Sequence, residues 1–264
     1  MWFIYDSCGI ACCIATYCIM IFVSTIVTKV SIIPLSSENY LDKTAFIIIY
    51  VLLLMLAGIS HLRCMLTDPG AIPKNSYDLN IEDFSKSSPQ TCLRCNCLKT
   101  PKTHHCSICE RCISKMDHHC PWINNCVGMY TQKFFLLFLF YIMLACIYSF
   151  ILLILRASFC VGHKKSDLCK EGSYQVTLDL ILGVISGFVN ALFLLFVTLM
   201  LYDQITCIIN NTSGIDILKN SSIEKRSVRV NFEETFGGRC SIFWLLPTAV
   251  KPPLSQTNIS IDIS

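Results

Sequence analysis

Cysteine and histidine are gathered in one stretch of this chain, residues 91–126, which reads TCLRCNCLKTPKTHHCSICERCISKMDHHCPWINNC. This Cys-rich segment holds eight cysteines and four histidines. Both residue types bind zinc, and both also serve as nucleophile or general base in catalysis. Two closed zinc sites take about eight ligands, so some of these side chains are surplus and free for chemistry. Spacing does not say which ones, although Cys97, two residues after Cys95, is poorly placed to bind the same ion.

The cysteines of this segment form overlapping Cys-x-x-Cys pairs. Cys92 pairs with Cys95, and Cys109 pairs with both Cys106 and Cys112. In a reducing compartment such pairs are typical of metal sites rather than of disulfides. The pattern therefore predicts zinc binding if the segment faces the cytosol.

The elements that must position these side chains are membrane helices. Of the 264 residues 53% are hydrophobic and 15% are charged, and the mean hydropathy is +0.56. Four apolar runs, residues 8–33, 45–66, 134–155 and 176–209, are each long enough to cross a hydrocarbon layer of about 30 Å. Buried helices of a soluble core are the weaker interpretation, because the chain lacks the polar surface to cover four of them. We expect an all-α polytopic membrane protein with the Cys-rich segment between helices 2 and 3.

The positions of Lys and Arg predict the orientation of these helices. Between the second and third runs lie Lys74, Lys86, Arg94, Lys99, Lys102, Arg111, Lys115 and Lys133. The C-terminal tail adds Lys219, Lys225, Arg226, Arg229, Arg239 and Lys251. The opposite side holds Lys29, Lys43, Arg156, Lys164, Lys165 and Lys170. The positive-inside rule therefore predicts that both termini and the Cys-rich segment face the cytosol.

Two further features bear on this topology. Glycosylation sequons begin at Asn210, Asn211, Asn220 and Asn258, and in isolation they favour a lumenal tail. The distribution of basic residues predicts instead that they are unused. Cys160 and Cys169 fall in the predicted lumenal loop, where oxidation permits a disulfide.

One motif set gives the Cys-rich segment a resemblance to a known family. Asp117, His118, His119 and Cys120 resemble the defining motif of the DHHC protein S-acyltransferases, or palmitoyltransferases. The DPG sequence at 68–70, the PWINNCVG sequence at 121–128 and the cysteine spacing are similar to that family as well, so the resemblance spans nearly the whole chain. The sequence TDPGAIPKN and the short chain look most like the Golgi-type members.

The resemblance implies two structural Zn²⁺ ions. It assigns one ion to Cys92, Cys95, His105 and Cys112, and the other to Cys106, Cys109, His119 and Cys126. Cys97, Cys120, His104 and His118 are then left over. By the same resemblance Cys120 is the nucleophile, His118 is its base, and Asp117 orients the imidazole.

The activity implied is transfer of a long-chain acyl group from palmitoyl-CoA or a related acyl-CoA to Cys120, and then to a cysteine of a substrate protein. The lipid bilayer, acyl-CoA and cysteine-containing proteins are therefore the expected partners. The resemblance assigns acyl contacts to Phe135, Phe138 and Trp122, although Phe135 and Phe138 on a membrane helix are also ordinary packing residues. Candidate partners of the CoA phosphates, chosen by position, are Lys99, Lys102, His104 and Lys115. The net charge of +3 is too small and too dispersed to predict nucleic-acid binding.

After the fourth apolar run, the sequence departs from the family pattern. The family usually has a TTxE motif there, and this chain has Ser213, Gly214, Ile215 and Asp216. Asn231 and Phe236 resemble a conserved Asn and an aromatic residue of the family's tail, for which we expect a structural role. The polar stretch from Pro252 onward is predicted to be disordered.

The expected domains are residues 1–66 with helices 1 and 2, a cytosolic zinc domain at 67–133, residues 134–209 with helices 3 and 4 and a lumenal loop, and a cytosolic tail at 210–264. A non-catalytic, membrane-anchored zinc-binding module is the main alternative. It explains the metal ligands equally well but gives no reason for Asp117 and His118 beside a surplus thiol. A metal transporter is less consistent with the sequence, because its helices carry few polar residues beyond His61, Asn190 and Asp203.

Overall fold

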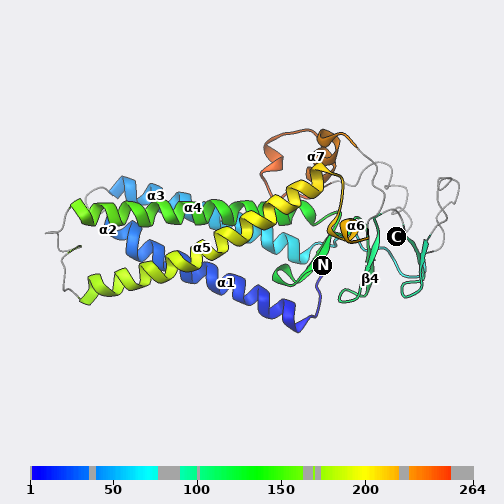
Figure 1. Ribbon diagram of the computed structural model, residues 1–264, viewed down its shortest axis with the longest axis horizontal. Coiled ribbons are helices and arrows are strands. Elements are labelled where there is room, and N and C mark those ends of the chain that lie inside the picture. Colours follow the sequence, from blue (N-terminus) through cyan, green and yellow to red (C-terminus); the bar gives the residue numbers. More distant parts are fainter. Residues whose placement is uncertain are drawn as a thin grey trace. The chain divides into compact units, whose positions relative to one another are not determined.

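Four long helices dominate the computed structural model (Figure 1), which describes residues 2–35, 40–76, 90–99, 102–162, 169, 174–219 and 226–250. The long helices are α1 (Ser7–Val27), α3 (Tyr40–Leu66), α4 (Gln132–Gly162) and α5 (Tyr174–Ile209). Helix α1 continues through a π-helical turn, Thr28–Ile32, into the short α2, Ile33–Leu35. The predicted disordered stretch from Pro252 lies outside the described residues.

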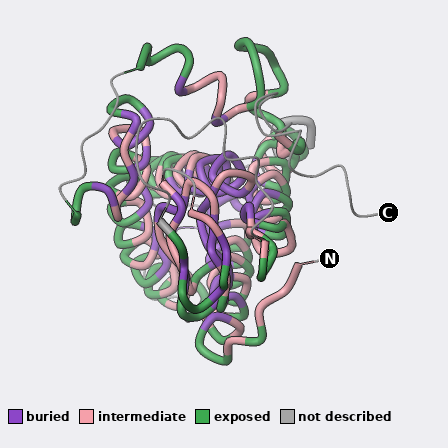
Figure 2. The backbone as a smooth tube through the Cα atoms, turned by 90° about the vertical axis from the view of Figure 1, so that its right-hand side faces the viewer, coloured by how far each residue is buried: buried purple, intermediate pink, exposed green. Residues whose placement is uncertain are grey.

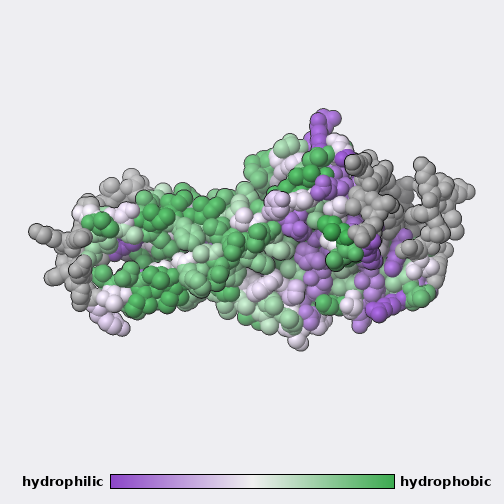
Figure 3. Space-filling view, viewed as in Figure 1, coloured by the Kyte–Doolittle hydropathy of each residue, from purple (hydrophilic) through white to green (hydrophobic). Residues whose placement is uncertain are grey.

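These helices confirm the predicted class of a mostly helical, multi-pass membrane protein. Four segments are long and apolar enough to cross a membrane, namely Ser7–Ile32, Thr44–Leu66, Gln132–Gly162 and Tyr174–Ile209. Their outward faces are exposed and apolar, as lipid-facing surfaces must be (Figures 2 and 3). On α5, for example, Leu180, Val184 and Phe188 are 65–67% exposed.

The Cys-rich segment forms three small antiparallel hairpins that composition and periodicity did not predict. Their strands are β1 (Gln90–Cys92), β2 (Cys97–Lys99), β3 (His104–Cys106), β4 (Arg111–Ile113), β5 (His118–Cys120) and β6 (Asn125–Val127). They pair as β1–β2, β3–β4 and β5–β6. Asn96, Glu110 and Asn124 occupy the left-handed region within the hairpin turns. A strand of three residues is too short to show a periodic pattern in the sequence. Hairpins this short are also too small to be stable alone, so their fold depends on the turns and on the metal that the thiols could bind.

Inter-residue contacts divide the chain into two compact units. The first comprises Met1–Cys13, Ile59–Leu137 and Asp203–Ser264, and the second comprises Ile14–Gly58 and Phe138–Tyr202. The second unit is built only from membrane-helix segments and their connections. Its core includes Val27, Ile32 and Leu152, none of which is accessible to solvent.

Buried polar groups in the second unit find partners inside the helix bundle. The Tyr50 hydroxyl lies 2.9 Å from Ser149 Oγ, and Asn190 Nδ2 donates to the Cys146 carbonyl over 2.9 Å. Such pairing is needed because the hydrocarbon layer offers no hydrogen bonds. Cys160 and Cys169 form a disulfide, and Arg156 Nη1 lies against both sulfur atoms.

In the first unit, the chain around Asp68–Gly70 fixes the entry to the hairpins. Asp68 Oδ1 accepts hydrogen bonds from the backbone N–H groups of Gly70 and Ala71, which turns the chain after α3. Gly70 has a φ of +104°, and its carbonyl accepts from the Ser114 N–H, beside β4. The DPG sequence therefore joins a membrane helix to the Cys-rich segment by backbone hydrogen bonds.

The end of α3 is also bound by Asn125, which lies next to the potential metal ligand Cys126. Asn125 Nδ2 donates to the carbonyls of Cys64 and Thr67, both over 2.9 Å. A helix leaves its last carbonyls without intrahelical partners, so a buried carboxamide at this position acts as a side-chain cap. Asn125 is fully buried.

Candidate active site and metal centres

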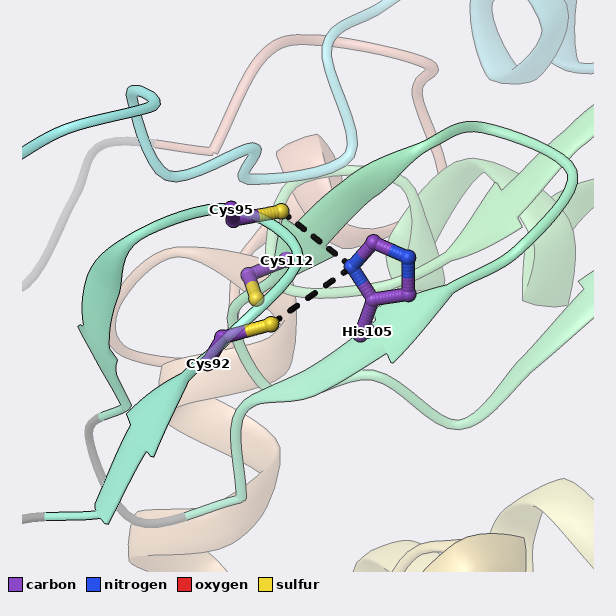
Figure 4. Close-up of side chains that lie close together, drawn as sticks. All are labelled: Cys92, Cys95, His105 and Cys112. Atoms are coloured by element: carbon purple, nitrogen blue, oxygen red, sulfur yellow. Dashed lines mark hydrogen bonds between the residues drawn. The ribbon is translucent and has the colours of Figure 1, made fainter.

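The first Cys/His group joins the β1–β2 and β3–β4 hairpins. Its members are Cys92, Cys95, His105 and Cys112, and their ligand atoms all lie within 4.8 Å of one another. Figure 4 shows the side chains converging, with His105 Nδ1 lying 3.1 Å from Cys95 Sγ and 3.7 Å from Cys92 Sγ. The register pairs His105 directly with Cys112 across β3 and β4. The hairpins therefore bring together donors that are up to twenty residues apart in sequence.

The second group has the same composition and a similar arrangement. Cys106, Cys109, His119 and Cys126 also place their ligand atoms within 4.8 Å of one another. His119 Nδ1 lies 3.6 Å from the Cys106 sulfur, 3.4 Å from that of Cys109 and 3.6 Å from that of Cys126. His119 and Cys126 are paired across β5 and β6.

Both groups match the dimensions of a structural zinc site. Bonds of roughly 2.0–2.3 Å to a tetrahedral ion place neighbouring ligand atoms about 3.3–3.8 Å apart. The distances from the two imidazoles to the thiols are 3.4–3.7 Å, except for the shorter 3.1 Å between His105 and Cys95. Three buried thiols around one imidazole are also the donor set that zinc prefers. The eight residues are those assigned from the resemblance, so Cys97, Cys120, His104 and His118 remain outside both groups. Cys97 is nevertheless fully buried beside the first group.

The alternation of side chains along β5 separates metal binding from chemistry. Successive residues of a strand point to opposite faces, so His118 and Cys120 share one face and His119 points to the other. His119 belongs to the second Cys/His group. The potential metal ligand His119 is therefore flanked by two side chains, His118 and Cys120, that lie together on the opposite face of the strand.

His118 is held by a short hydrogen bond to the preceding residue. Its Nδ1 lies 2.6 Å from Asp117 Oδ2, so the Nδ1 proton is shared with the carboxylate and Nε2 faces away. Nε2 is buried and makes no hydrogen bond to the described residues. Burial by itself lowers the pKa of His118, but Asp117 and the nearby Cys120 outweigh that effect and raise the pKa to about 9. The imidazole is thus suited to take up a proton and to hold it beside a thiolate.

Two residues far along the chain complete the surroundings of Asp117. Gln204 Nε2, from α5, donates to Oδ2 over 2.8 Å, and the Gly214 N–H, at the start of α6 (Gly214–Leu218), donates to Oδ1 over 2.6 Å. Burial raises the pKa of Asp117, but the hydrogen bonds from His118, Gly214 and Gln204 lower it below the ordinary value. The carboxylate therefore stays ionised in a site where only 7% of its side chain is exposed.

Comparisons with known proteins agree with this geometry. The family model described as DHHC palmitoyltransferase matches residues 85–221. The chain belongs to the DHHC palmitoyltransferase family. It is 38% identical over 255 residues to palmitoyltransferase ZDHHC3 of Homo sapiens, a match that covers 94% of this chain and 84% of the relative.

Two other relatives extend the likeness across species. Palmitoyltransferase ZDHHC7 of Rattus norvegicus is 38% identical over 253 residues, covering 94% of this chain and 80% of the relative. The probable protein S-acyltransferase 12 of Arabidopsis thaliana is 33% identical over 234 residues, covering 82% of this chain and 78% of the relative. This DHHC protein is thus similar to the named acyltransferases over most of its length.

The aromatic residues predicted to contact the acyl chain occupy different surroundings. Phe135 lies edge-on to His118, with 5.5 Å between the ring centroids and a 71° angle between the rings. Trp122 lies in the short 3₁₀ turn η3 (Pro121–Ile123), and its side chain is 39% exposed. Phe138 is buried in α4, in the second compact unit.

Most of the side chains predicted to meet CoA phosphates bind other parts of this chain. Lys102 Nζ donates to both the carbonyl and the Oδ1 of Asn211 over 2.6 Å, and Lys115 Nζ pairs with Glu234 over 3.5 Å. His104 Nε2 lies 3.7 Å from Asp216 Oδ1. Lys99, on β2, is half-buried. A phosphate at Lys102 or Lys115 therefore competes with a contact already made.

The variant motif at residues 213–216 has a structural explanation. Ser213 Oγ accepts from the Asp216 N–H over 3.1 Å, while Asp216 Oδ2 accepts from the Ser213 N–H over 3.0 Å. This reciprocal capping box starts α6 and leaves the Gly214 N–H free to bind Asp117. Asp216, although shorter than the glutamate of the family motif, therefore still completes the capping box that presents the Gly214 N–H to Asp117.

The conserved-looking residues of the tail have structural partners as well. Asn231, in α7 (Val228–Phe236), donates through Nδ2 to the Ile208 carbonyl at the end of α5 over 2.9 Å. Phe236 stacks on Trp244 of the 3₁₀ turn η4 (Ile242–Trp244), with 4.8 Å between the ring centroids. These contacts agree with the expected structural role.

The two buried cysteines Cys97 and Cys112 should respond differently to substitution. We expect Cys112→Ser to lower the zinc content by about one ion per chain, because the serine removes one of four ligands. Cys97→Ser should keep both ions, although it changes a thiol that is just as buried. Metal analysis of the purified variants measures the number of zinc ions per chain. Equal loss in both would mean that Cys97 is itself a ligand.

The hydrogen bonds of Asp117 predict a large effect of Asp117→Asn. The amide NH₂ has to face either the Gly214 N–H or both His118 and Gln204, so at least one donor loses its acceptor. In both orientations the imidazole loses its counter-charge. We expect the rate of acyl-enzyme formation to fall by about a hundredfold or more, with zinc retained. Glu233→Gln is the matched control, because Glu233 pairs with an exposed arginine of α7. A rate equal to that of the control would remove Asp117 from the mechanism.

Proposed function

We propose that this protein is a protein-cysteine S-palmitoyltransferase in which Cys120 carries the acyl group. The observation that supports the assignment most directly is the face of β5 opposite the metal group, where His118 and Cys120 share one side and His118 is bound to Asp117. A zinc-binding module with no reaction to catalyse has no need for an unligated thiol beside an oriented imidazole. Membership of a catalytic family supports the same choice.

The first step transfers the acyl group to the enzyme. His118 Nε2 takes the proton of the Cys120 thiol, and the thiolate attacks the carbonyl carbon of a long-chain acyl-CoA. The bond to the CoA sulfur breaks, and the proton held on His118 leaves with the CoA thiol. One thioester is exchanged for another, so the step needs no further source of energy.

The second step repeats the exchange on a substrate protein. A substrate cysteine gives its proton to His118 and attacks the acyl carbon, and the sulfur of Cys120 leaves as a thiolate that recovers this proton. Zn²⁺ ions bound to the two Cys/His groups would each be held by three cysteines and one histidine, and would act as structural supports. The protein supplies orientation, and the reaction stays on Cys120 and His118.

The bilayer brings the donor to this site. An acyl chain gains about 0.8 kcal/mol per CH₂ buried, so acyl-CoA is already concentrated at the membrane. We propose that the chain is bound near Phe135, Phe138 and Trp122, and that CoA phosphates meet Lys99, Lys102, His104 and Lys115. The contacts made by Lys102 and Lys115 imply that CoA binding releases Asn211 and Glu234.

We propose the domain organisation that the charge distribution predicts, with a cytosolic zinc domain at 67–133, helices at 1–66 and 134–209, and a cytosolic tail at 210–264. The sequence TDPGAIPKN favours a Golgi membrane, with the endoplasmic reticulum as the other candidate. The disulfide between Cys160 and Cys169 supports a lumenal position for the loop between α4 and α5.

The orientation predicts that Asn210, Asn211, Asn220 and Asn258 carry no glycan. We expect treatment of the protein from a eukaryotic host with an endoglycosidase to leave its mass unchanged. A sequon introduced between residues 163 and 168 serves as the control, because it should be glycosylated. A glycan on any tail sequon would reverse the topology.

Cys120→Ser tests the function itself. We expect purified wild-type protein to acquire a hydroxylamine-sensitive label from labelled palmitoyl-CoA, because a thioester at Cys120 is cleaved by hydroxylamine. Cys120→Ser should remain unlabelled while keeping about two zinc ions per chain, since Cys120 lies outside both Cys/His groups. Cys18→Ser, which changes an exposed cysteine of α1, should label like wild type. Equal labelling of Cys120→Ser and wild type would contradict the proposal.

A further inference from the structure

The segment that precedes and begins α1 packs against the loop that follows the nucleophile. Trp2 Nε1 donates to Asn125 Oδ1 over 3.0 Å, and Asn124 Nδ2 donates to the Ile4 carbonyl over 2.7 Å. Ile4 also packs against the buried cluster that contains Cys126. Residues more than a hundred positions apart are thus joined directly beside the second Cys/His group.

Gly9 allows the closest of these approaches. A Cβ built on Gly9 would overlap the side-chain carboxamide of Asn124, which has no solvent-accessible surface. Asn124 itself adopts the left-handed conformation, with a φ of 47°, so its side chain is held in one direction by the turn. Glycine is costly inside a helix, yet here it makes room for a neighbour.

A further contact lies one turn along α1 from Gly9. Cys13 Sγ donates to the Trp122 carbonyl over 3.4 Å, and His61 Nε2, from α3, lies 2.8 Å from the same oxygen. Contacts at Trp2, Ile4, Gly9 and Cys13 therefore cover the loop 122–125. That loop joins Cys120 to the potential metal ligand Cys126.

We propose that residues 2–13 form an N-terminal strap that positions Cys120 for acyl transfer, with Trp2 and Gly9 as positioning residues. This proposal rests on the proposed function. Only Pro121 separates this loop from Cys120, so a shift of the loop moves the end of β5 and carries the Cys120 sulfur away from His118 Nε2. Misplacing a reacting group by about 1 Å costs up to roughly a hundredfold in rate.

Gly9→Ala is the sharpest test. Helix propensity favours alanine over glycine at this position, whereas the strap predicts that alanine slows acylation. Alanine favours a helix by about 1 kcal/mol over glycine, so helix propensity alone predicts a variant that is as stable as wild type or more stable. The strap predicts that the maximal rate of single-turnover acylation falls about tenfold or more, because the new methyl group displaces Asn124. The acyl-CoA concentration for half-maximal rate and the zinc content should stay unchanged. Gly58→Ala is the matched control, since a Cβ there meets no atom within 4 Å.

A double substitution tests whether the effect travels through Asn124. Asn124→Gly removes the carboxamide and suits the left-handed backbone. In that background Gly9→Ala should cause little further loss of rate, because the overlap with Asn124 is gone and the nearest remaining atom is Asp6 Oδ2 at 3.0 Å. Two effects that simply multiply would show that Gly9 acts elsewhere and would overturn the proposed path.

Trp2→Phe keeps the proposal testable if Gly9→Ala disturbs folding. It keeps an aromatic ring but replaces the indole by a smaller one and removes the N–H that binds Asn125, and we expect about a threefold or greater fall in the maximal rate with zinc retained. A wild-type rate for Trp2→Phe, or for Gly9→Ala with zinc retained, would overturn the strap and leave the acyltransferase assignment standing. Failure of the wild-type protein to form a Cys120 thioester would instead overturn the proposed function.

Discussion

The extended backbone of β5 imposes the constraint on which the active site depends. Neighbouring side chains of a strand cannot share a face, so a run of three potential ligands is divided between two environments. His119 is directed to the metal group, and this fixes the directions of His118 and Cys120. A change of register by one residue would exchange metal ligands and reactive groups. The pairing of His119 with Cys126 across the hairpin prevents that change.

The carboxylate of Asp117 extends this constraint to the rest of the first compact unit. It lies on the residue before β5, yet its other hydrogen-bond donors come from α5 and α6, which are 87 and 97 residues away. A buried carboxylate is stable only while such donors are in place. The capping box at Ser213 and Asp216 fixes one donor, and the membrane helix fixes the other. Helix ends and the proposed catalytic residues are thus parts of one polar network.

The sequence predicted those features that depend on local composition. Long apolar runs predicted four membrane helices, because length and hydropathy alone decide whether a helix can cross a membrane. The division of Cys and His between metal groups and reaction came from the family resemblance, since overlapping pairs are consistent with several ligand sets.

Other features could not be predicted, because they depend on contacts between distant segments. No periodicity marks three-residue strands, and neither Gln204 nor the Gly214 N–H carries a signal that relates it to Asp117. The N-terminal strap is an extreme case, because Trp2 and Asn125 are 123 residues apart. The aromatic residue Trp2 and the small residue Gly9 look unremarkable at the start of an apolar run. Their positions become informative only with the loop 122–125 in view.

The cap that Asn125 places on α3 has a consequence for the membrane part of the molecule. Asn125 is adjacent to Cys126, so the residue that binds the last carbonyls of a membrane helix is held by the same hairpin that gathers thiols around His119. The free energy of metal binding is folding free energy for such a hairpin. Part of the free energy of metal binding would therefore stabilise the end of α3. A chain without metal would then leave the last carbonyls of α3 without this cap, as well as lacking an ordered hairpin.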